Sequence, residues 1–347
     1  MLFFVVGGGI FLFVYSKGYP LTQIKKAFGL LFKREEEKGI SRFQALSAVL
    51  AATVGLGNIS GVAIAIHMGG PGVLIWMWLT ALFGMSTKYS EALLAVKYRE
   101  KGPNGMRGGP MYYIAKGAGL PWLGSVFAVC TFLAAFGAGN MVQANATASI
   151  FLNVFDIPTM WTGGVLAILA GLVIVGGIKS IGRFASFFVP FMILLYVGTV
   201  LFVLAIRFDE IPGAFSLIFS HAFNGHAATG GFVGATLAAA IRFGVARGLF
   251  SNEAGLGSAP IVAAAAKTND PVRQALVSMT GTFIDTIIVC TLTALVILTT
   301  DVWTEGISAA ELTARSIAVS LGNTGATIVA VCSALFAFST LIGWSYY

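Results

Sequence analysis

Two glycine-rich stretches inside long apolar runs contain the residues best suited to bind a small ligand. The first, residues 53–61, reads TVGLGNISG and has three glycines in seven residues. Each glycine costs about 1 kcal/mol relative to alanine in a helix, so this stretch predicts a helix that breaks. At membrane depth, the amide and carbonyl groups freed by a break are tolerated where they line a cavity and bind an ion or a carboxylate. Helix packing through small residues is the alternative, but Asn58 adds polarity that packing does not require.

The second stretch, residues 240–260, reads AIRFGVARGLFSNEAGLGSAP. Its two arginines, its glutamate and its four glycines cannot all face lipid, because a charge at the bilayer centre costs at least ~2.5–3.5 kcal/mol. This run is therefore predicted to break or to line a wet cavity. Within it, residues 255–258 (GLGS) repeat the pattern of residues 55–58 (GLGN), and two interrupted helices at corresponding positions are typical of a transporter binding site. A chance repeat in a glycine-rich chain is the alternative.

Asp285 adds a carboxylate to another apolar run. An ionisable group at membrane depth is a functional hypothesis by default, so Asp285 is a candidate ligand for a cation. An ion pair with Arg242 or Arg247 is an equally good explanation.

Two further groups of polar residues lie within apolar runs. Asn140, Gln143 and Thr147 share one face of a predicted helix, which fits hydrogen bonding between helices as well as contact with a ligand. Ser339 and Thr340 offer hydroxyl oxygens that fit a cage around a small hard cation, although such hydroxyls usually bond to their own backbone.

The composition identifies the environment of these residues. Of the 347 residues, 57% are hydrophobic and only 10% are charged, and the mean hydropathy is +0.88, which is far outside the range of soluble domains. The net charge of +7 comes from basic residues in short gaps between apolar runs, not from a basic face that would bind nucleic acid. Sequence signatures of metalloproteases, hydrolases and nucleotide-binding loops are absent, which argues against an enzyme. Runs read as membrane spans lie near residues 2–15, 43–66, 72–96, 121–151, 160–178, 184–206, 230–266, 275–298 and 326–347.

All nine runs are predicted to be helices, because a helix satisfies its own backbone groups in lipid, so the fold class is an all-α integral membrane protein. Seventeen of the 21 basic residues lie in alternate gaps, whereas the intervening gaps hold only Arg207 and Arg315. An excess of Lys and Arg marks the cytoplasmic side. We therefore expect a multi-pass protein of the cell membrane with its N-terminus outside and the end of this chain in the cytoplasm. The helical spacing of apolar residues in 308–321 predicts a short helix lying in an outer loop.

Long motifs run through nearly the whole chain. They are GNISGVAIAI (57–66), GGPGVLIWMWLTALFGMSTKYSEALLAVKYRE (69–100), RGGPMYYI (107–114), RFGVARGLFSNEAGLGSAP (242–260), FIDTIIVCTLTAL (283–295) and FAFSTLIGWSYY (336–347). These motifs closely resemble those of the alanine or glycine:cation symporter family, often called sodium:alanine symporters.

The resemblance implies a LeuT-like fold built from two inverted repeats. Residues 1–347 would form a single transporter domain, with a leader span at 2–15, a first repeat at 43–206 and a second repeat at 230–347. The family pattern continues for two more spans beyond the last residue, so the second repeat is expected to have three of its five helices. We therefore expect this chain to be a fragment, or a truncated protein that alone shows no sodium-dependent alanine uptake.

The resemblance also implies a secondary symporter that carries alanine or glycine into the cell with sodium by alternating access. A cation channel or a non-transporting membrane scaffold or receptor is the alternative. The sixth core helix would break at 242–245, with Phe243 over the substrate and residues 255–258 lower, on the cytoplasmic half. The expected partners are a small neutral amino acid (alanine or glycine), the lipid bilayer and sodium, which is the coupling ion and the only metal expected. No nucleic acid and no other cofactor are expected. The residues expected to bind the amino acid are Gly55, Leu56, Gly57, Asn58, Gln143, Phe243 and Gly244, and those expected to bind sodium are Val54, Gly57, Ser339, Thr340 and Asp285.

Overall fold

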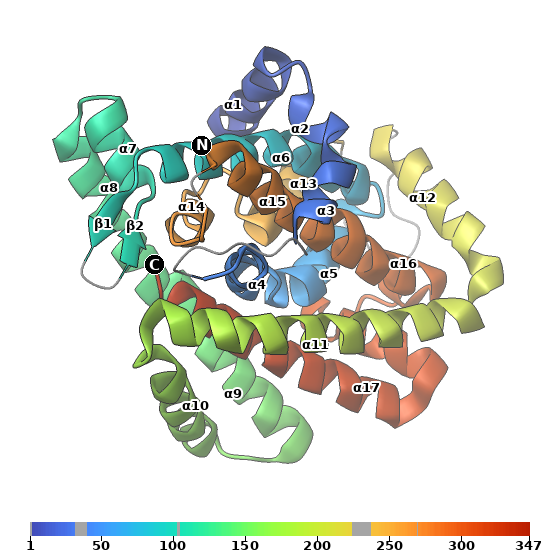
Figure 1. Ribbon diagram of the computed structural model, residues 1–347. Helices are drawn as coiled ribbons and strands as arrows, with labels where there is room; N and C mark the ends of the chain where they lie inside the picture. Colours follow the sequence, from blue (N-terminus) through green and yellow to red (C-terminus); the bar gives the residue numbers. More distant parts are fainter. Residues whose placement is uncertain (1, 32–39, 103–104, 224–236, 269) are drawn as a thin grey trace.

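The computed structural model describes residues 2–31, 40–102, 105–223, 237–268 and 270–347, and helices dominate this part of the chain (Figure 1). The α-helices are α1 (Leu2–Tyr15), α2 (Tyr19–Thr22), α3 (Ile24–Leu31), α4 (Arg42–Thr53), α5 (Val62–Gly69), α6 (Val73–Lys97), α7 (Pro110–Gly117), α8 (Pro121–Ala134), α9 (Val142–Phe155), α10 (Thr159–Ile174), α11 (Gly177–Ile206), α12 (Ile211–Phe223), α13 (Leu237–Asn252), α14 (Ala259–Ala263), α15 (Pro271–Thr282), α16 (Thr291–Thr299) and α17 (Ala309–Trp344). Short π-helices are η1 (Gly57–Gly61), η2 (Ala135–Met141) and η4 (Phe283–Cys290), and the 3₁₀ turns are η3 (Phe208–Glu210) and η5 (Val302–Thr304).

One small antiparallel hairpin departs from the all-helical prediction. It pairs β1 (Glu100–Gly102) with β2 (Gly105–Arg107), and Glu100 lies opposite Arg107. Each strand has only three residues, so the molecule is still a helical protein.

In the described part of the chain, four helices are long and apolar enough to cross a membrane, and a bent pair makes a fifth candidate. The four are Pro121–Leu152, Gly177–Ile206, Pro271–Thr299 and Glu311–Trp344, and the bent pair joins Arg42–Thr53 to Gly57–Gly69 at 55°. Each of the nine predicted runs contains a helix, although the start of the seventh run, residues 230–236, lies outside the described residues. The prediction of an all-α membrane protein therefore agrees with the structure.

Gly322 divides α17 into two parts. Its backbone lies at φ 62° and ψ −153°, a conformation that glycine adopts readily, and the helix kinks there. The part before the kink corresponds to the helix predicted at 308–321, and the part after it to the predicted span at 326–347.

The centre of the molecule is α4, which Figure 1 shows nearly end-on. Helices α11, α14, α15 and α17 all pack against it. Small residues on α4, including the buried Ala45, Ala48, Ala51 and Ala52, let these helices approach closely. The end of α4 therefore lies in the middle of the bundle, where the chain breaks.

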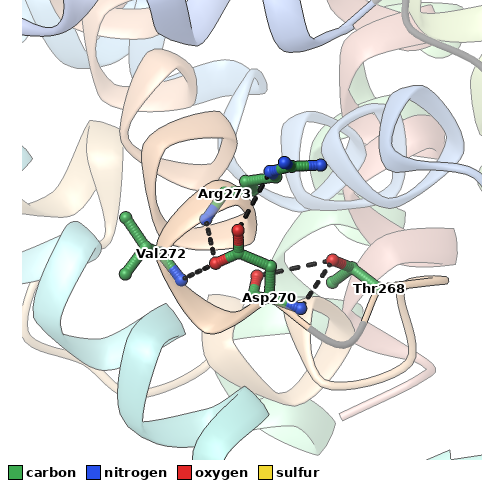
Figure 2. A network of polar contacts seen from close by, with 4 residues as sticks. All are labelled: Thr268, Asp270, Val272 and Arg273. Atoms are coloured by element: carbon green, nitrogen blue, oxygen red, sulfur yellow. Dashed lines mark hydrogen bonds and ion pairs between the residues drawn. The ribbon is translucent and has the colours of Figure 1, made fainter.

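The start of α15 is held by a local polar network around Asp270 (Figure 2). The Asp270 Oδ1 atom accepts hydrogen bonds from the amides of Val272 (3.0 Å) and Arg273 (3.2 Å), and Oδ2 lies 2.9 Å from Arg273 Nε. The Asp270 amide donates to the Thr268 hydroxyl (3.1 Å). An aspartate N-cap with a proline at the next position is a standard helix start, so this network fixes where α15 begins.

The contact between α17 and α4 gives a testable prediction. A Cβ atom added at Gly343 would lie 2.6 Å from the backbone nitrogen of Ala52, so Gly343→Ala must push the two helices apart. We expect a loss of about 1–3 kcal/mol in stability, because overpacking forces backbone shifts. The measurement is thermal unfolding of the detergent-solubilised protein. Gly198→Ala in α11 is the matched control, since nothing lies within 4 Å of its added Cβ, and equal unfolding temperatures for the two variants would contradict the prediction.

Candidate functional site

The first helix interruption lies where the glycine cluster predicts it. The chain leaves α4 at Val54, which has extended backbone angles (φ −78°, ψ 95°), and re-enters helix at η1. The Asn58 side chain closes the break, because its Oδ1 accepts a hydrogen bond from the Gly55 amide (2.9 Å). The prediction of a broken helix here is confirmed.

Gly55 is required by the neighbouring helix as well as by the break. A Cβ atom at this position would lie 2.3 Å from the Thr340 Oγ1 atom, so only glycine allows α17 to approach the end of α4 so closely. The Thr340 hydroxyl donates to the Phe336 carbonyl (3.0 Å), and the neighbouring Ser339 hydroxyl donates to the Ala51 carbonyl (3.3 Å). Two hydroxyl groups therefore lie beside the last turn of α4.

A cavity of about 220 Å³ opens beside this break. Its wall combines segments from four regions of the chain: the end of α4, the π-helix η2 with the start of α9, the end of α13, and α17. The lining residues are Ala52, Thr53, Gly55, Leu56, Gly57, Ala134, Ala138, Gln143, Phe250, Glu253, Leu256, Thr340 and Trp344.

Five of the residues expected to bind a ligand therefore meet at one cavity: Gly55, Leu56, Gly57, Gln143 and Thr340. Val54 and Ser339 do not line it, but both are buried next to residues that do. Residues that are far apart in the sequence thus form one cavity with backbone, amide and hydroxyl groups in its wall.

The prediction of a helix break at 242–245 is wrong, because α13 runs without interruption from Leu237 to Asn252. Gly244 serves helix packing instead: a Cβ atom there would lie 2.6 Å from the Val73 carbonyl oxygen of α6. The Phe243 ring lies 5.9 Å from the Arg242 guanidinium and is not part of the cavity wall. Phe243 and Gly244 therefore do not line this cavity.

The second interruption lies instead at residues 253–258, which contain the GLGS repeat. Glu253, Gly255 and Gly257 have φ angles of 54°, 86° and 76°, all in the left-handed region. Two glycines in this segment make the left-handed turns possible, whereas residues 242–245 contain one glycine that packs against α6. The prediction that this run breaks is confirmed, and the position follows the repeat.

Asn58 lies in a buried polar cluster behind the cavity, not in the cavity wall. Its Nδ2 atom lies within hydrogen-bond distance of Asp285 Oδ1 (2.6 Å) and Ser251 Oγ (3.1 Å). Asp285 Oδ2 accepts from the hydroxyls of Ser251 (2.7 Å) and Thr286 (2.8 Å). The cluster ties the first break to the end of α13 and to η4.

The neutral partners of Asp285 argue against the alternative that it forms an ion pair with Arg242 or Arg247. No ion pair joins Asp285 to Arg242 or Arg247 in the described part of the chain, and Arg247 lies over the Phe250 ring at 5.7 Å. The carboxylate is instead surrounded by an amide and two hydroxyls. All three partners donate hydrogen bonds to the carboxylate, and such bonds favour its charged form.

All three π-helices of the described chain border these two polar regions. Segment η1 forms the far side of the first break, η2 leads into Gln143, and η4 contains Asp285. Single-turn π-helices interrupt the regular hydrogen-bond ladder and occur frequently at functional sites. Sequence patterns of glycine and apolar residues did not predict them.

Sequence reasoning missed four prominent residues of the wall: Phe250, Glu253, Leu256 and Trp344. The charge of Glu253 in an apolar run was the one signal available, whereas Phe250 and Leu256 look like ordinary membrane residues. Trp344 reaches the cavity because it packs on Gly139, where a Cβ atom would lie 2.6 Å from the indole. That contact joins residues 205 positions apart and has no local signature.

Comparisons with known proteins agree with these features. A family model described as the sodium:alanine symporter family matches residues 1–347. An uncharacterised transporter of Haemophilus influenzae is 49% identical over all of this chain and 77% of its own length. The sodium/alanine symporter AgcS of Methanococcus maripaludis is 48% identical over all of this chain and 78% of its own length. A probable sodium/glutamine symporter of Bacillus subtilis, GlnT, is 41% identical over 90% of this chain and 64% of its own length.

Proposed function

Because this chain belongs to the sodium:alanine symporter family, we propose that it carries alanine or glycine into the cell together with sodium by alternating access. At the coarser level, it is a sodium-coupled amino-acid symporter of the membrane. The observation that carries the finer proposal is that both interrupted segments, next to α4 and after α13, border the same cavity. Paired interruptions of this kind form the substrate and ion sites of many secondary transporters.

The cavity supports a small substrate. Its volume of about 220 Å³ is below the range of ~300–1,000 Å³ typical of sites for drug-sized ligands. The substrate carboxylate binds at the amides of Leu56 and Gly57, since the helix that follows presents its positive end there and the Gly55 amide already donates to Asn58. The Gln143 amide and the Thr340 hydroxyl supply polar walls, and the Phe250 ring covers an apolar side. This wall leaves room for hydrogen or methyl as a side chain.

Sodium binds beside the same break. The hydroxyls of Ser339 and Thr340 lie against the last turn of α4, where the carbonyls around Val54 and Gly57 are the other oxygen ligands. A second candidate position is the Asp285 cluster, in which a carboxylate and two hydroxyls meet. Because both positions adjoin the broken helix, cation binding and substrate binding would order the same segment.

Transport then follows from a LeuT-like arrangement in which one bundle rocks against the other around this cavity. The interrupted helices provide the flexible points, because a break has no continuous backbone ladder to resist bending. Enclosure by α4, α9, α13 and α17 keeps the polar groups away from lipid during the movement.

Sodium-dependent uptake tests the proposal directly. Proteoliposomes containing the full-length protein should accumulate radiolabelled alanine and glycine saturably when sodium is present outside, and not when choline replaces it at the same pH. Glutamine is the first competitor to include, since one relative is named as a probable sodium/glutamine symporter. Non-saturable alanine flux would favour a channel, and no flux at all would favour a scaffold or receptor.

Replacement of Asn58 tests whether the break supports transport. Asn58→Leu removes the acceptor for the Gly55 amide and the partner of the Asp285 carboxylate. We expect at least about a tenfold loss of alanine uptake with membrane insertion intact, since leaving a buried charge without its partner is strongly unfavourable. Asn323→Leu, at an exposed position in α17, is the control and should transport normally. Wild-type uptake kinetics in Asn58→Leu would move the site elsewhere.

Replacement of the two hydroxyls tests the cation position. In Ser339→Ala/Thr340→Ala, two oxygens are lost, so the sodium concentration for half-maximal uptake should rise, since hard cations are held by ligand number and geometry. The carbonyls of the broken helix remain, so we expect weaker sodium binding and not its abolition. Unchanged sodium dependence would assign the cation to the Asp285 cluster.

A further inference from the structure

A buried group of charges adjoins the second interruption and has no role in the proposed binding of the substrate or sodium. Lys88 and Glu91 come from α6, and Glu253 is the first residue of the interrupted segment. Their exposed fractions are 2%, 9% and 3%. Charges are rarely buried to this extent unless they are paired, so the three must be explained together.

The two carboxylates hold the interrupted segment in place. Glu91 Oε1 accepts a hydrogen bond from the Gly257 amide (3.2 Å). Glu253 Oε2 accepts from the Ser258 hydroxyl at 2.5 Å. Glu91 therefore satisfies a backbone amide that the interruption of the helix leaves free, and Glu253 closes the segment on itself.

The segment is also part of the cavity wall. Glu253 and Leu256 both line the cavity, as does Trp344. Among the lining residues, Glu253 carries the only charge. A shift of residues 253–258 would therefore move a carboxylate of the wall.

Lys88 supplies the compensating charge. The carboxylates of Glu253, Glu91 and Asp285 all lie close enough to attract its ammonium group. Among the described residues, the buried Lys88 Nζ atom has no hydrogen-bond partner, and neither has the buried Glu91 Oε2 atom. The ammonium therefore acts on the carboxylates through its charge and not through a hydrogen bond to either one.

We propose that Lys88 is a positioning residue of the transport cavity. The Lys88 ammonium is buried on α6, one turn before Glu91, and compensates the carboxylates of Glu91 and Glu253. These carboxylates accept hydrogen bonds from the Gly257 amide and the Ser258 hydroxyl, and so fix residues 253–258 against the cavity. Without the lysine, two neighbouring buried negative charges would repel each other and lose their hold on the segment. The consequence for transport rests on the proposed function, whereas the consequence for the segment does not.

The test compares Lys88→Met with a variant in which the whole cluster is neutral, Lys88→Met/Glu91→Gln/Glu253→Gln. Lys97→Met is the matched control, because Lys97 is exposed near the end of the same helix. Hydrogen exchange by mass spectrometry on the detergent-solubilised full-length protein reports the order of residues 253–258, and sodium-dependent uptake gives the substrate concentration for half-maximal rate.

We expect Lys88→Met to speed exchange in residues 253–258 at least about tenfold while exchange in α11 is unchanged, because breaking a buried charge balance acts locally first. The half-saturating alanine concentration should rise more than the maximal rate falls. The neutral variant should bring exchange back toward wild type, since glutamine keeps the accepting oxygens without the repulsion. Lys97→Met should match wild type in both measurements.

Wild-type exchange in Lys88→Met, or faster exchange spread evenly over all helices, would overturn the proposal. If Lys88→Met does not insert into the membrane, insertion and folding of the neutral triple variant would support the proposal. If neither variant inserts, the proposal is contradicted. Absence of uptake in the wild type would defeat the proposed function alone, because the exchange measurement still tests the role of Lys88.

Discussion

Backbone groups released at two helix interruptions must find partners inside the bundle, and the rest of the architecture depends on how they do so. Water is scarce at this depth, and an unpaired amide or carbonyl costs several kcal/mol there. The first break is closed by the Asn58 side chain, which caps the Gly55 amide. The second is closed by Glu91, which accepts the Gly257 amide from a different helix. The first solution is local, whereas the second requires α6 to lie alongside the interrupted segment.

Close approach of α17 to α4 is the second condition, and glycines make it possible. Gly55 leaves space for Thr340, and Gly343 leaves space for the backbone of Ala52. These contacts place hydroxyl groups within reach of carbonyls at the end of α4, which is what a small cation requires. Helix packing and the proposed ion site thus depend on the same small residues. A methyl group at Gly55 or Gly343 would push α17 away from α4 and move the hydroxyls away from the carbonyls.

The two buried acidic regions differ in the partners of their carboxylates. Asp285 accepts hydrogen bonds from the Asn58 amide and two hydroxyls, which join the first break to the end of α13. Glu91 and Glu253 instead accept hydrogen bonds from groups within residues 253–258. Lys88 attracts carboxylates of both regions, so the two regions share one compensating charge. The same chemical group therefore joins helices in one region and holds a turn in the other, and the neighbouring donors make the difference.

The sequence by itself determined the class of protein, the positions of the membrane helices and the break in the first core helix. These properties are local, because hydropathy and the cost of glycine act within one segment. The sequence also indicated that the run at 230–266 breaks. Only the tertiary structure decided where, because Gly244 packs on α6 and α13 continues past it to end before Glu253. The cavity wall, with Phe250 and Trp344 instead of Phe243, and the burial of Lys88 beside Glu253 were likewise decided by tertiary packing. Such contacts join residues more than a hundred positions apart, and their energies depend on enclosure, which no local pattern of residues contains.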